Sequence, residues 1–439
     1  MGKHGATKNR KTRFAADKDT RVKKAKQPKQ NKRNKKRDVL SYENVPIKEY
    51  NEYSHNEVKL DKGLIKRVFV VVGIIVVLMI FVLIFANRES ITWDNISTWF
   101  SQSILGVSEG EDYPVEIVGT EISKGNFRMM GDYPAYASDT SYVELSSTAG
   151  EIINTQLNFS SPIVRGTSNY NIVYGAGSNG FLINDVKKTK HKGSTKYGIF
   201  TADINSDGYY CIVTEGSGYL SVMTAYNNEY KKMYEYSFAD YYITSVAINS
   251  RGNQAVCCGI TSVNGAEHTK VYVLDFNKEK PVMEYDLTES VIYDIFYLSS
   301  DTVSAVANNA VYTLDLSEEE PMKEPYNSRT LTTYEYNPDT KTFVVSLSRS
   351  GDGRNCDILF FDSSGEIDYT INSDYKVEAV STYKGDLAIL SNGKLYLLDD
   401  DGTVDGTAEA GNDARSFVMY KSDKAYVFGI SEIRKADFK

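Results

Sequence analysis

The sequence predicts an all-β fold, a β-propeller of eight blades, preceded by one transmembrane α-helix and a disordered basic tail. The first observation is a series of short alternating stretches rich in Tyr, Val and Ile, which sheets favour. The second is their recurrence at a period of about 40 residues, which is typical of propeller blades. The third is an uninterrupted apolar stretch upstream of the repeats. Seven blades are the alternative count.

The charge of the chain is divided unevenly. Residues 1–67 hold 21 Lys and Arg against 8 Asp and Glu, a net charge of +13, whereas the remainder holds 29 against 50, a net charge of −21. Residues 1–63 offer little to bury, so we expect a disordered cytoplasmic tail whose basic residues favour anionic lipid headgroups. Nucleic acid is the less favoured partner, because residues 3–37 contain one aromatic side chain, Phe14, and no binding module.

A transmembrane helix is predicted over residues 64–87. Its centre, Val68 to Ala86, is a run of 19 residues without a charge, and at about 1.5 Å per residue it roughly matches the hydrocarbon core of a bilayer. A cleaved signal peptide does not fit, because the preceding region is too long and no A-x-A-like site follows. The basic flank lies upstream, so we expect a single-pass cell-membrane protein with a cytoplasmic N-terminus and an extracytoplasmic body.

Residues 88–112 are expected to form a juxtamembrane helix and a linker. Trp93, Ile96 and Phe100 are spaced three and four residues apart, which places them on one face of a helix. This helix lies either at the level of the lipid headgroups or packs as a stalk against the body.

The body, residues 113–439, contains the repeats. Similar alternating strands precede four aspartates at separations of 40, 47 and 37 residues, namely Asp275, Asp315, Asp362 and Asp399. The third strands of successive blades are expected near residues 143, 182, 221, 273, 313, 360, 397 and 434. The last unit has room for only three strands. The early segment "PVEIVGTEIS" is therefore expected to complete it, which removes an exposed edge.

The segment "DINSDG", which begins at Asp203, resembles the opening of a calcium loop. A calcium loop also requires a bidentate Glu at its twelfth position, which is Thr214 here. The segments "INSRGNQAV" and "YNPDTKTFVV" hold the equivalent place in later units, where Asx, Gly and Pro favour hairpin turns. We therefore expect a turn between the first and second strands of a blade, and no metal site.

With these repeats behind a single span, the chain resembles bacterial single-span proteins with an extracytoplasmic β-propeller, including uncharacterised families of Gram-positive bacteria. The units are also similar to quinoprotein-like and tryptophan–aspartate-type blades, although no blade contains a Trp-Asp dipeptide or a Gly-His pair. The resemblance covers residues 64–439. It implies an architecture rather than an activity.

Cysteine and histidine indicate no catalytic chemistry. Cys211 and the pair Cys257–Cys258 lie within expected second strands, where cysteine is usually a small buried hydrophobe. The pair is similar to vicinal cysteines that pyrroloquinoline-quinone dehydrogenases of this fold can carry near their cofactor. Those enzymes also use blade tryptophans, and both tryptophans of this chain precede the body. We expect no cofactor, and the sequence contains no catalytic triad order, zinc motif or phosphate loop.

Two surface features are candidates for binding. The segment 187–196 forms either a solvated turn or a dock for an anionic polymer or membrane surface. Its lysines are Lys187, Lys188, Lys190, Lys192 and Lys196. In addition, two connections between second and third strands are long, 261–270 in the fourth blade and 348–355 in the sixth. They should rise on one face, separated by the short "ANNA" connection of the fifth blade.

These two long connections form the predicted binding seat. Loops on a rigid scaffold commonly carry function, and arginine is enriched at interface hot spots, so the two arginines are favoured. The side chains of the seat are Asn264, Glu267, His268, Arg349, Asp352 and Arg354.

We therefore expect a membrane-anchored cell-envelope protein whose extracytoplasmic propeller is a non-catalytic scaffold that binds a protein or polymer. The alternative is an envelope enzyme that acts on a glycan or small molecule at the propeller axis, with quinoprotein chemistry the least favoured. Convergent carboxylates in an axial cleft would favour the enzyme, whereas a broad patch with uneven loops would favour the scaffold.

Overall fold

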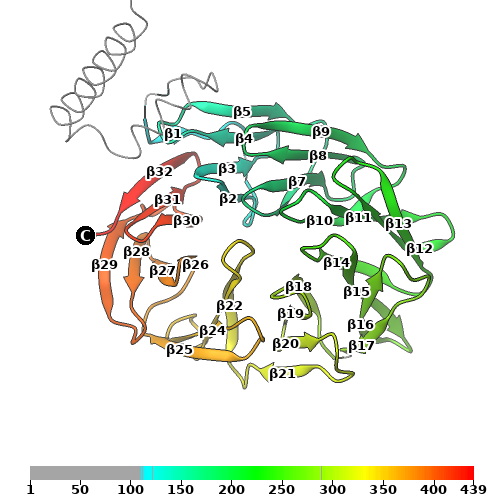
Figure 1. Cartoon of the computed structure of the whole chain (residues 1–439). Coiled ribbons are helices and arrows are strands. Elements are labelled where there is room, and N and C mark those ends of the chain that lie inside the picture. Colours follow the sequence, from blue (N-terminus) through cyan, green and yellow to red (C-terminus); the bar gives the residue numbers. More distant parts are fainter. Residues whose placement is uncertain (1–109, 111, 121, 288) are drawn as a thin grey trace, which may run out of the picture. The chain divides into compact units, whose positions relative to one another are not determined.

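The computed structural model describes residues 110, 112–120, 122–287 and 289–439. These residues form eight four-stranded antiparallel sheets around a common axis (Figure 1). The prediction of an all-β propeller with eight blades is confirmed.

The predicted tail, transmembrane helix and juxtamembrane helix lie outside the described residues. Within the part of the chain that the structure describes, no helix is long and apolar enough to cross a membrane.

Each blade is a meander of four consecutive strands. Blade 1 consists of β2 (Phe127–Met130), β3 (Tyr133–Ala137), β4 (Ser141–Leu145) and β5 (Glu151–Gln156). Blade 2 consists of β6 (Pro162–Gly166), β7 (Tyr170–Gly175), β8 (Gly180–Asp185) and β9 (Lys188–Ser194). Blade 3 consists of β10 (Ile199–Ile204), β11 (Tyr210–Gly216), β12 (Tyr219–Tyr226) and β13 (Lys232–Phe238). Blade 4 consists of β14 (Tyr242–Ile248), β15 (Gln254–Val263), β16 (Ala266–Asp275) and β17 (Met283–Asp286).

The remaining blades repeat this order, with the first strands toward the axis and the fourth strands at the rim (Figure 1). Blade 5 consists of β18 (Ile292–Tyr297), β19 (Thr302–Ala307), β20 (Ala310–Asp315) and β21 (Met322–Pro325). Blade 6 consists of β22 (Thr330–Asn337), β23 (Thr342–Ser348), β24 (Cys356–Phe361) and β25 (Ile367–Ser373). Blade 7 consists of β26 (Ala379–Tyr383), β27 (Asp386–Ser391), β28 (Lys394–Leu398) and β29 (Val404–Glu409). All eight third strands lie where the repeat predicted them.

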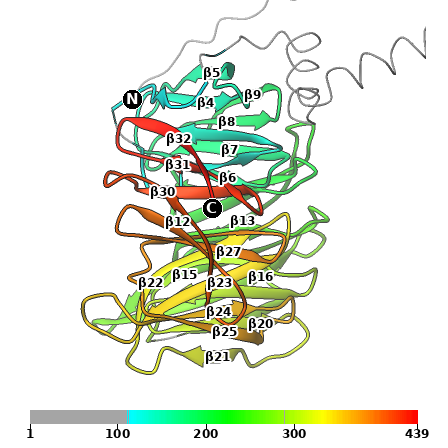
Figure 2. The same cartoon turned by 90° about the vertical axis from the view of Figure 1, so that its left-hand side faces the viewer.

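Blade 8 closes the ring with strands from both ends of the body. It consists of β30 (Ser416–Lys421), β31 (Lys424–Phe428), β32 (Glu432–Asp437) and, outermost, β1 (Val115–Glu116). Figure 2 views the ring from the side of these strands. The predicted closure by the early segment is confirmed, although its strand is only two residues long.

The hydrophobic core is divided into layers between neighbouring blades. Successive side chains of a strand point to opposite faces of the sheet, so Cys257 of β15 packs toward blade 3, whereas Cys258 packs toward blade 5. Val344 and Val345 of β23 likewise belong to different layers. Both faces of a blade are therefore buried, which explains why its inner strands are nearly continuous apolar runs.

Three of the four recurring aspartates, Asp275, Asp315 and Asp362, stand at the end of a third strand and shape the turn to the fourth strand. The Oδ1 atom accepts a hydrogen bond from the backbone N–H two residues on, at 2.8 Å for Asp275, 2.9 Å for Asp315 and 2.8 Å for Asp362. These are Asx-turns, in which a short carboxylate replaces a backbone acceptor. The regular spacing of these residues thus reflects turn geometry.

The "DINSDG" segment is the turn between β10 and β11, as predicted. Asn205 Oδ1 accepts hydrogen bonds from the backbone N–H groups of Asp207 and Tyr209, both at 3.0 Å. The carboxylate of Asp203 instead accepts a hydrogen bond from the Ile248 N–H of the next blade at 3.0 Å. The side chain of Asp207 is exposed to solvent, whereas that of Asp203 contacts the next blade.

Candidate functional site

The first candidate site is the face on which second strands connect to third strands, which we call the hairpin face. Because the strands alternate in direction in all eight sheets, these connections reach the same end of the ring. They are residues 138–140, 176–179, 217–218, 264–265, 308–309, 349–355, 392–393 and 429–431. The predicted placement of the blade 4 and blade 6 segments on one face, with blade 5 between them, is confirmed.

The blade 4 connection differs from the prediction, and the expected loop over 261–270 is wrong. β15 and β16 stay paired as far as Val263 and Ala266, which leaves the two-residue turn of Asn264 and Gly265. Their φ angles are 54° and 83°. Positive φ at both central residues is typical of the tight turn that joins long antiparallel strands.

The blade 4 hairpin projects beyond its own sheet. β14 pairs with β15 only as far as Ile260, and β17 pairs with β16 only as far as Lys270. Residues 261–269 therefore form a two-stranded ribbon that extends roughly 10 Å past its neighbours, at about 3.3 Å per residue. Of the predicted site residues on this ribbon, Asn264 and Glu267 are exposed and His268 is half-buried.

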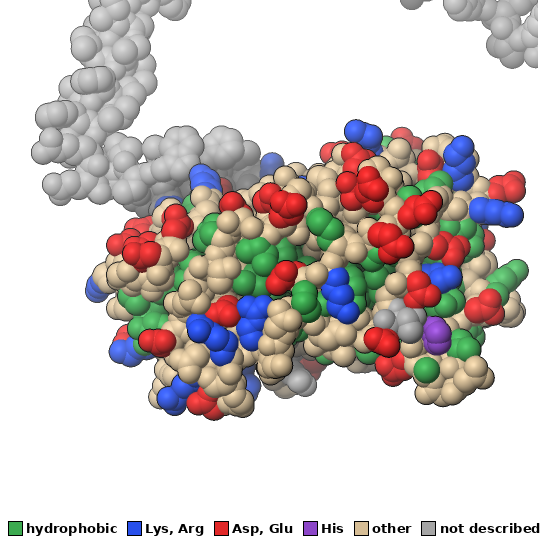
Figure 3. Space-filling model, turned by 90° about the horizontal axis from the view of Figure 1, so that it is seen from below, with side chains coloured by type: hydrophobic (Ala, Val, Ile, Leu, Met, Phe, Trp, Pro, Cys, Tyr) green, Lys and Arg blue, Asp and Glu red, His purple; other side chains and the backbone are tan. Residues whose placement is uncertain are grey.

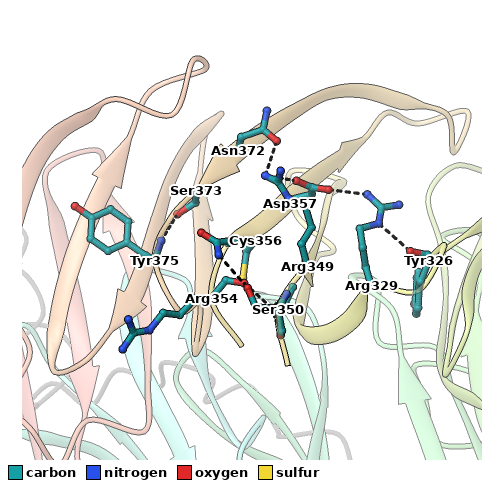
Figure 4. A network of polar contacts seen from close by, with 12 residues as sticks. Tyr326, Arg329, Arg349, Ser350, Arg354, Cys356, Asp357, Asn372, Ser373 and Tyr375 are labelled. Carbon is teal, nitrogen blue, oxygen red and sulfur yellow. Dashed lines mark hydrogen bonds and ion pairs between the residues drawn. The ribbon is translucent and has the colours of Figure 1, made fainter. Parts of the chain in front are cut away.

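Blade 6 carries the long loop that the sequence predicted, over residues 349–355. Arg349 is held against the blade, because its Nη2 lies 2.9 Å from Asp357 Oδ1 and donates to Asn372 Oδ1 at 3.1 Å (Figure 4). Arg329 shares the same carboxylate, with 2.9 Å between its Nη1 and Asp357 Oδ2. Arg329 Nη2 also lies 3.9 Å from Glu324 Oε1, so the two guanidinium groups of this network are balanced by two carboxylates.

Arg354 is the more available arginine of the blade 6 loop. Its Nε lies 3.5 Å from Asp352 Oδ2, and both side chains are more than half exposed. Its side chain points away from the network around Asp357 (Figure 4). An exposed pair of this kind contributes little to stability, so Arg354 can exchange Asp352 for a partner's carboxylate at small cost.

Blade 5 has a short connection on the hairpin face, between the projecting hairpin of blade 4 and the long loop of blade 6. Its connection is the two-residue turn of Asn308 and Asn309. Asn308 Oδ1 accepts a hydrogen bond from the Val291 N–H at 2.9 Å, and Asn309 Nδ2 donates to the Glu289 carbonyl at 3.1 Å. The turn is thus tied to the segment that leads into the blade.

Exposed tyrosines on the hairpin face were not singled out from the sequence. Three of them lie at strand ends that reach this face. Tyr219 is the first residue of β12, Tyr242 is the first residue of β14, and Tyr293 is the second residue of β18. Their exposed fractions are 47%, 51% and 51%. The chain has 33 tyrosines, and most fill the layers between blades, so the sequence pattern does not separate these three.

The lysine-rich segment is not a turn, which corrects that interpretation. It forms β9, the outermost strand of blade 2, and its exposed lysines alternate with half-buried residues. Lys190 Nζ lies 3.3 Å from Asp185 Oδ2. Lysines on an edge strand prevent pairing with other strands, which accounts for most of them without a ligand.

The outer surface carries charges of both signs. In Figure 3, acidic and basic side chains are interspersed with apolar ones on the side of the molecule that is drawn. This mixture provides no single-sign field to attract a polyelectrolyte there.

The second candidate site is a cavity on the propeller axis, which was expected only for the enzyme alternative. Its volume is about 1280 Å³, and residues from the first six blades line it. Arg165 of β6 and Asp294 of β18 meet across it, with 2.7 Å between Nη1 and Oδ2. Arg128 of β2 donates from Nη1 to the Gly166 carbonyl at 2.7 Å, while its buried Nε has no hydrogen-bond partner among the described residues.

One end of the cavity is crossed by the turn between β22 and β23. Asp339 in this turn accepts a hydrogen bond at Oδ2 from the Ser168 N–H of blade 2 at 3.0 Å. Blades 2 and 6 stand opposite each other in a ring of eight. Tyr336 also donates a hydrogen bond to the Tyr297 carbonyl of blade 5. The turn therefore bridges the ring at the end opposite the hairpin face.

Burial alters the charge states of the cavity side chains. It raises the pKa of Asp203 to about 6, against the opposing effects of the Ile248 N–H and Arg165. It lowers the pKa of Arg128, and the charge of Arg165 lowers that pKa further. Lys341, in the crossing turn, also has its pKa lowered by burial. The cavity thus concentrates ionisable groups in a poorly solvated place.

No group of three or more His, Cys, Asp or Glu side chains among the described residues is arranged to hold a metal ion. The four cysteines are free and buried. Cys257 and Cys258 point to opposite faces of blade 4, and burial raises the pKa of both thiols.

Comparison with known proteins adds a family without an assigned activity. The family described as "Family of unknown function (DUF5711)" matches residues 115–436. No curated protein matches the sequence. Among solved structures, BamB from Moraxella catarrhalis is similar at 12% identity and a TM-score of 0.44, over 74% of this chain and 100% of that chain. Hydrazine synthase from Kuenenia stuttgartiensis is similar at 14% identity and a TM-score of 0.41, over 71% and 94% of the two chains.

Proposed function

Because the chain belongs to the family of unknown function DUF5711, whose description assigns no activity, we propose its function from its surfaces. We propose a membrane-anchored cell-envelope protein whose propeller is a scaffold that binds a protein or polymer on its hairpin face. The observation that carries this proposal is the ribbon of residues 261–269, which stands beside the low turn of blade 5 and the long loop of blade 6.

The chemistry of the hairpin face supports a macromolecular partner. Tyr219, Tyr242 and Tyr293 present large amphipathic surfaces at a low cost in conformational entropy. Aromatic and arginine side chains dominate the energetic centres of protein interfaces. With Arg354 at the neighbouring loop, this face combines both kinds of anchor on a rigid framework.

Shortening the projecting ribbon tests the proposal. Ile260 is joined to Thr269 through an Asn-Gly turn, which keeps the Ile260–Thr269 pair and the ladders on both sides. We expect the variant to fold, because every fully buried core residue of the blade is retained. Capture of partners by crosslinking in the native cell, read by mass spectrometry, should fall at least about tenfold if a hot spot is lost.

Matched substitutions locate the contact more finely. Tyr242→Ser and Tyr293→Ser remove exposed rings from the hairpin face, whereas Met322→Ser removes a similarly exposed apolar side chain at the start of the outermost strand of blade 5. The two tyrosine variants should lose crosslinked partners and the Met322 variant should retain them. Unchanged capture by both tyrosine variants and by the shortened ribbon would exclude this face.

The membrane topology rests on the sequence of residues outside the described part of the chain. With the basic flank inside, an external protease on intact cells or spheroplasts should digest a C-terminal tag and spare an N-terminal tag. A chain whose four basic residues nearest the span, Lys59, Lys62, Lys66 and Arg67, are replaced by Gln serves as the comparison, because its orientation signal is weakened. Digestion of the N-terminal tag in the parent chain would contradict the proposed topology.

The axial cavity favours a second candidate function, an envelope enzyme with a small-molecule substrate. Asp203 and Asp294 both line this cavity. However, Asp294 is paired with Arg165 at 2.7 Å, and Asp203 accepts a hydrogen bond from a backbone N–H. A general base must be free to accept a substrate proton, and both carboxylates already have partners within the protein. The cavity therefore favours binding over catalysis.

A further inference from the structure

The axial cavity contains positive charge that the protein does not neutralise by direct contact. The negative charge of Asp294 is taken by Arg165. Asp339, in the turn that crosses the cavity, accepts hydrogen bonds from the backbone N–H of Ser168 in blade 2. Within the described residues, Arg128 and Lys341 make no ion pair, although both line the cavity.

Arg128 is the least satisfied of these groups. A guanidinium has five N–H donors, and the only hydrogen bond of Arg128 within the described residues goes to the Gly166 carbonyl. The buried Nε has no hydrogen-bond partner in the part of the chain that the structure describes. A buried donor left without an acceptor carries the full cost of its desolvation, so this side chain is stabilised by any acceptor that enters the cavity.

The position of Arg165 strengthens the demand for an anion. The pKa of Arg128 is lowered first by burial and next by Arg165, which means that the two guanidinium groups repel each other. An oxyanion beside them reduces this repulsion and accepts hydrogen bonds from the planar fork of Arg128. Asp203 also lines the cavity, but its carboxylate accepts a hydrogen bond from the Ile248 N–H at 3.0 Å and makes no ion pair with either guanidinium among the described residues, so the donors of Arg128 stay unfilled.

The remaining walls fit an organic body attached to the anionic group. Ile163, Val246, Phe296 and Leu331 line the same cavity, next to the hydroxyl-bearing rings of Tyr334 and Tyr336. Ligand cavities in proteins typically combine an apolar lining with a few oriented polar groups. The volume of about 1280 Å³ is large enough for a small molecule together with water.

We propose that the axial cavity binds a small organic anion, whose carboxylate or phosphate group is held by Arg128 with Lys341 nearby. The turn between β22 and β23 covers one end of this site through the contact of Asp339 with Ser168. This binding site is distinct from the hairpin face, and neither proposal depends on the other.

The test uses the full-length chain in detergent micelles and three probes, inorganic phosphate, phenyl phosphate and benzoate. Chloride is replaced by each probe at constant ionic strength, so that general screening does not change. We expect at least one probe to raise the melting temperature, and calorimetric titration to give its affinity. An effect of phenyl phosphate indicates a phosphate ester, and an effect of benzoate indicates a carboxylate; either supports the proposal.

Variants assign the effect to the cavity. Arg128→Gln should weaken the affinity for the effective probe about tenfold or more, as expected for the loss of charge-assisted hydrogen bonds, and Arg128→Lys should retain part of it. Arg415→Gln, an exposed arginine of blade 8, is the control and should bind like the parent. The variant with the shortened ribbon should also keep its affinity.

Two outcomes would overturn the inference. One is a parent chain whose melting temperature responds to none of the three probes. The other is an equal response in the parent and in Arg128→Gln, which would show binding elsewhere. If Arg128→Gln does not fold, Lys341→Gln decides, because Lys341 lies in the turn between β22 and β23 and outside the hydrophobic layers; an affinity equal to that of the parent then contradicts the proposal.

Discussion

Glu144 is a fully buried carboxyl in β4 of blade 1, and neither of its oxygens has a hydrogen-bond partner among the described residues. Burial, together with a smaller effect of the charge of Asp185, raises its pKa from 4.5 to about 9. A carboxyl with this pKa is protonated at neutral pH. The free energy needed to keep it protonated is drawn from the stability of the fold.

Glu144→Gln should therefore stabilise the protein in a manner that depends on pH. The folded pKa lies above the unfolded value, so the parent loses stability progressively as pH rises from about 4.5 towards 9, whereas the neutral amide does not. At pH 7 we expect the variant to be more stable by about 3 kcal/mol, because pH 7 lies about 2.5 units above the unfolded pKa and each unit contributes about 1.4 kcal/mol.

Chemical denaturation between pH 4.5 and 8.5 measures this difference. The two proteins should have equal stability near pH 4.5 and diverge above it. Glu319→Gln, at an exposed carboxylate of blade 5, should follow the parent at every pH. A constant difference across the range would mean that Glu144 is charged in the folded protein.

Single residues of the cavity were beyond sequence reasoning for a related reason. Arg128, Arg165 and Asp294 are separated by 37 and 129 residues, and only the closed ring brings their blades together. Each lies in an ordinary first strand, where nothing local marks it. The loop residues Arg349 and Arg354 were found because they stand in an unusually long connection.

At the scale of elements, turn chemistry was more informative than segment length. The length of the connection around "SVNGAE" predicts a loop, but Asn-Gly is the preferred pair for a two-residue hairpin turn. Polar residues on both sides of it belong to strands that leave the sheet, because a projecting ribbon has no apolar layer to cover. The pattern of buried alternation ends where the ribbon leaves the blade.

In the lysine-rich segment, too, the alternation of side chains is more informative than the composition. Lysine is depleted in strands, so a run of lysines favours the prediction of a turn. In β9 the alternation is nevertheless present, with Thr189 and His191 half-buried between the exposed Lys188, Lys190 and Lys192. His191 also stacks on Tyr230 of blade 3, with 4.3 Å between ring centroids. An edge strand tolerates this composition because only one of its faces is covered.

At the scale of the whole molecule, the repeat specified most of the fold. The blade number, the third strands and the ring closure followed from spacing, since each blade must bury both faces against its neighbours. The axial cavity did not follow from spacing, because its shape depends on the turn of blade 6 that reaches blade 2. The spacing of the repeat determines the number of blades and the closure of the ring, whereas individual turns determine the shape of the axial cavity.

Closure by β1 leads to the prediction for the whole molecule. A chain that begins at Lys124 lacks β1 and leaves Ile433 of β32 without its strand partner. This chain also lacks Tyr113 and Val115, which pack against blade 8. The hydroxyl of Tyr136 loses the hydrogen bond that it accepts from the Val118 N–H at 2.9 Å. We expect this chain to melt about 5 °C or more below one that begins at Glu111, or to aggregate through the opened edge.

The comparison needs a control that keeps β1 in place. Glu116→Ala in the longer chain removes only an exposed carboxylate from β1 and should leave the melting temperature within about 1 °C, as is usual for surface substitutions. Thermal unfolding followed by circular dichroism, with light scattering for aggregation, distinguishes these cases. If both chains melt at the same temperature and neither aggregates, β1 does not stabilise the ring. The three strands that remain in blade 8 would then have to close it alone.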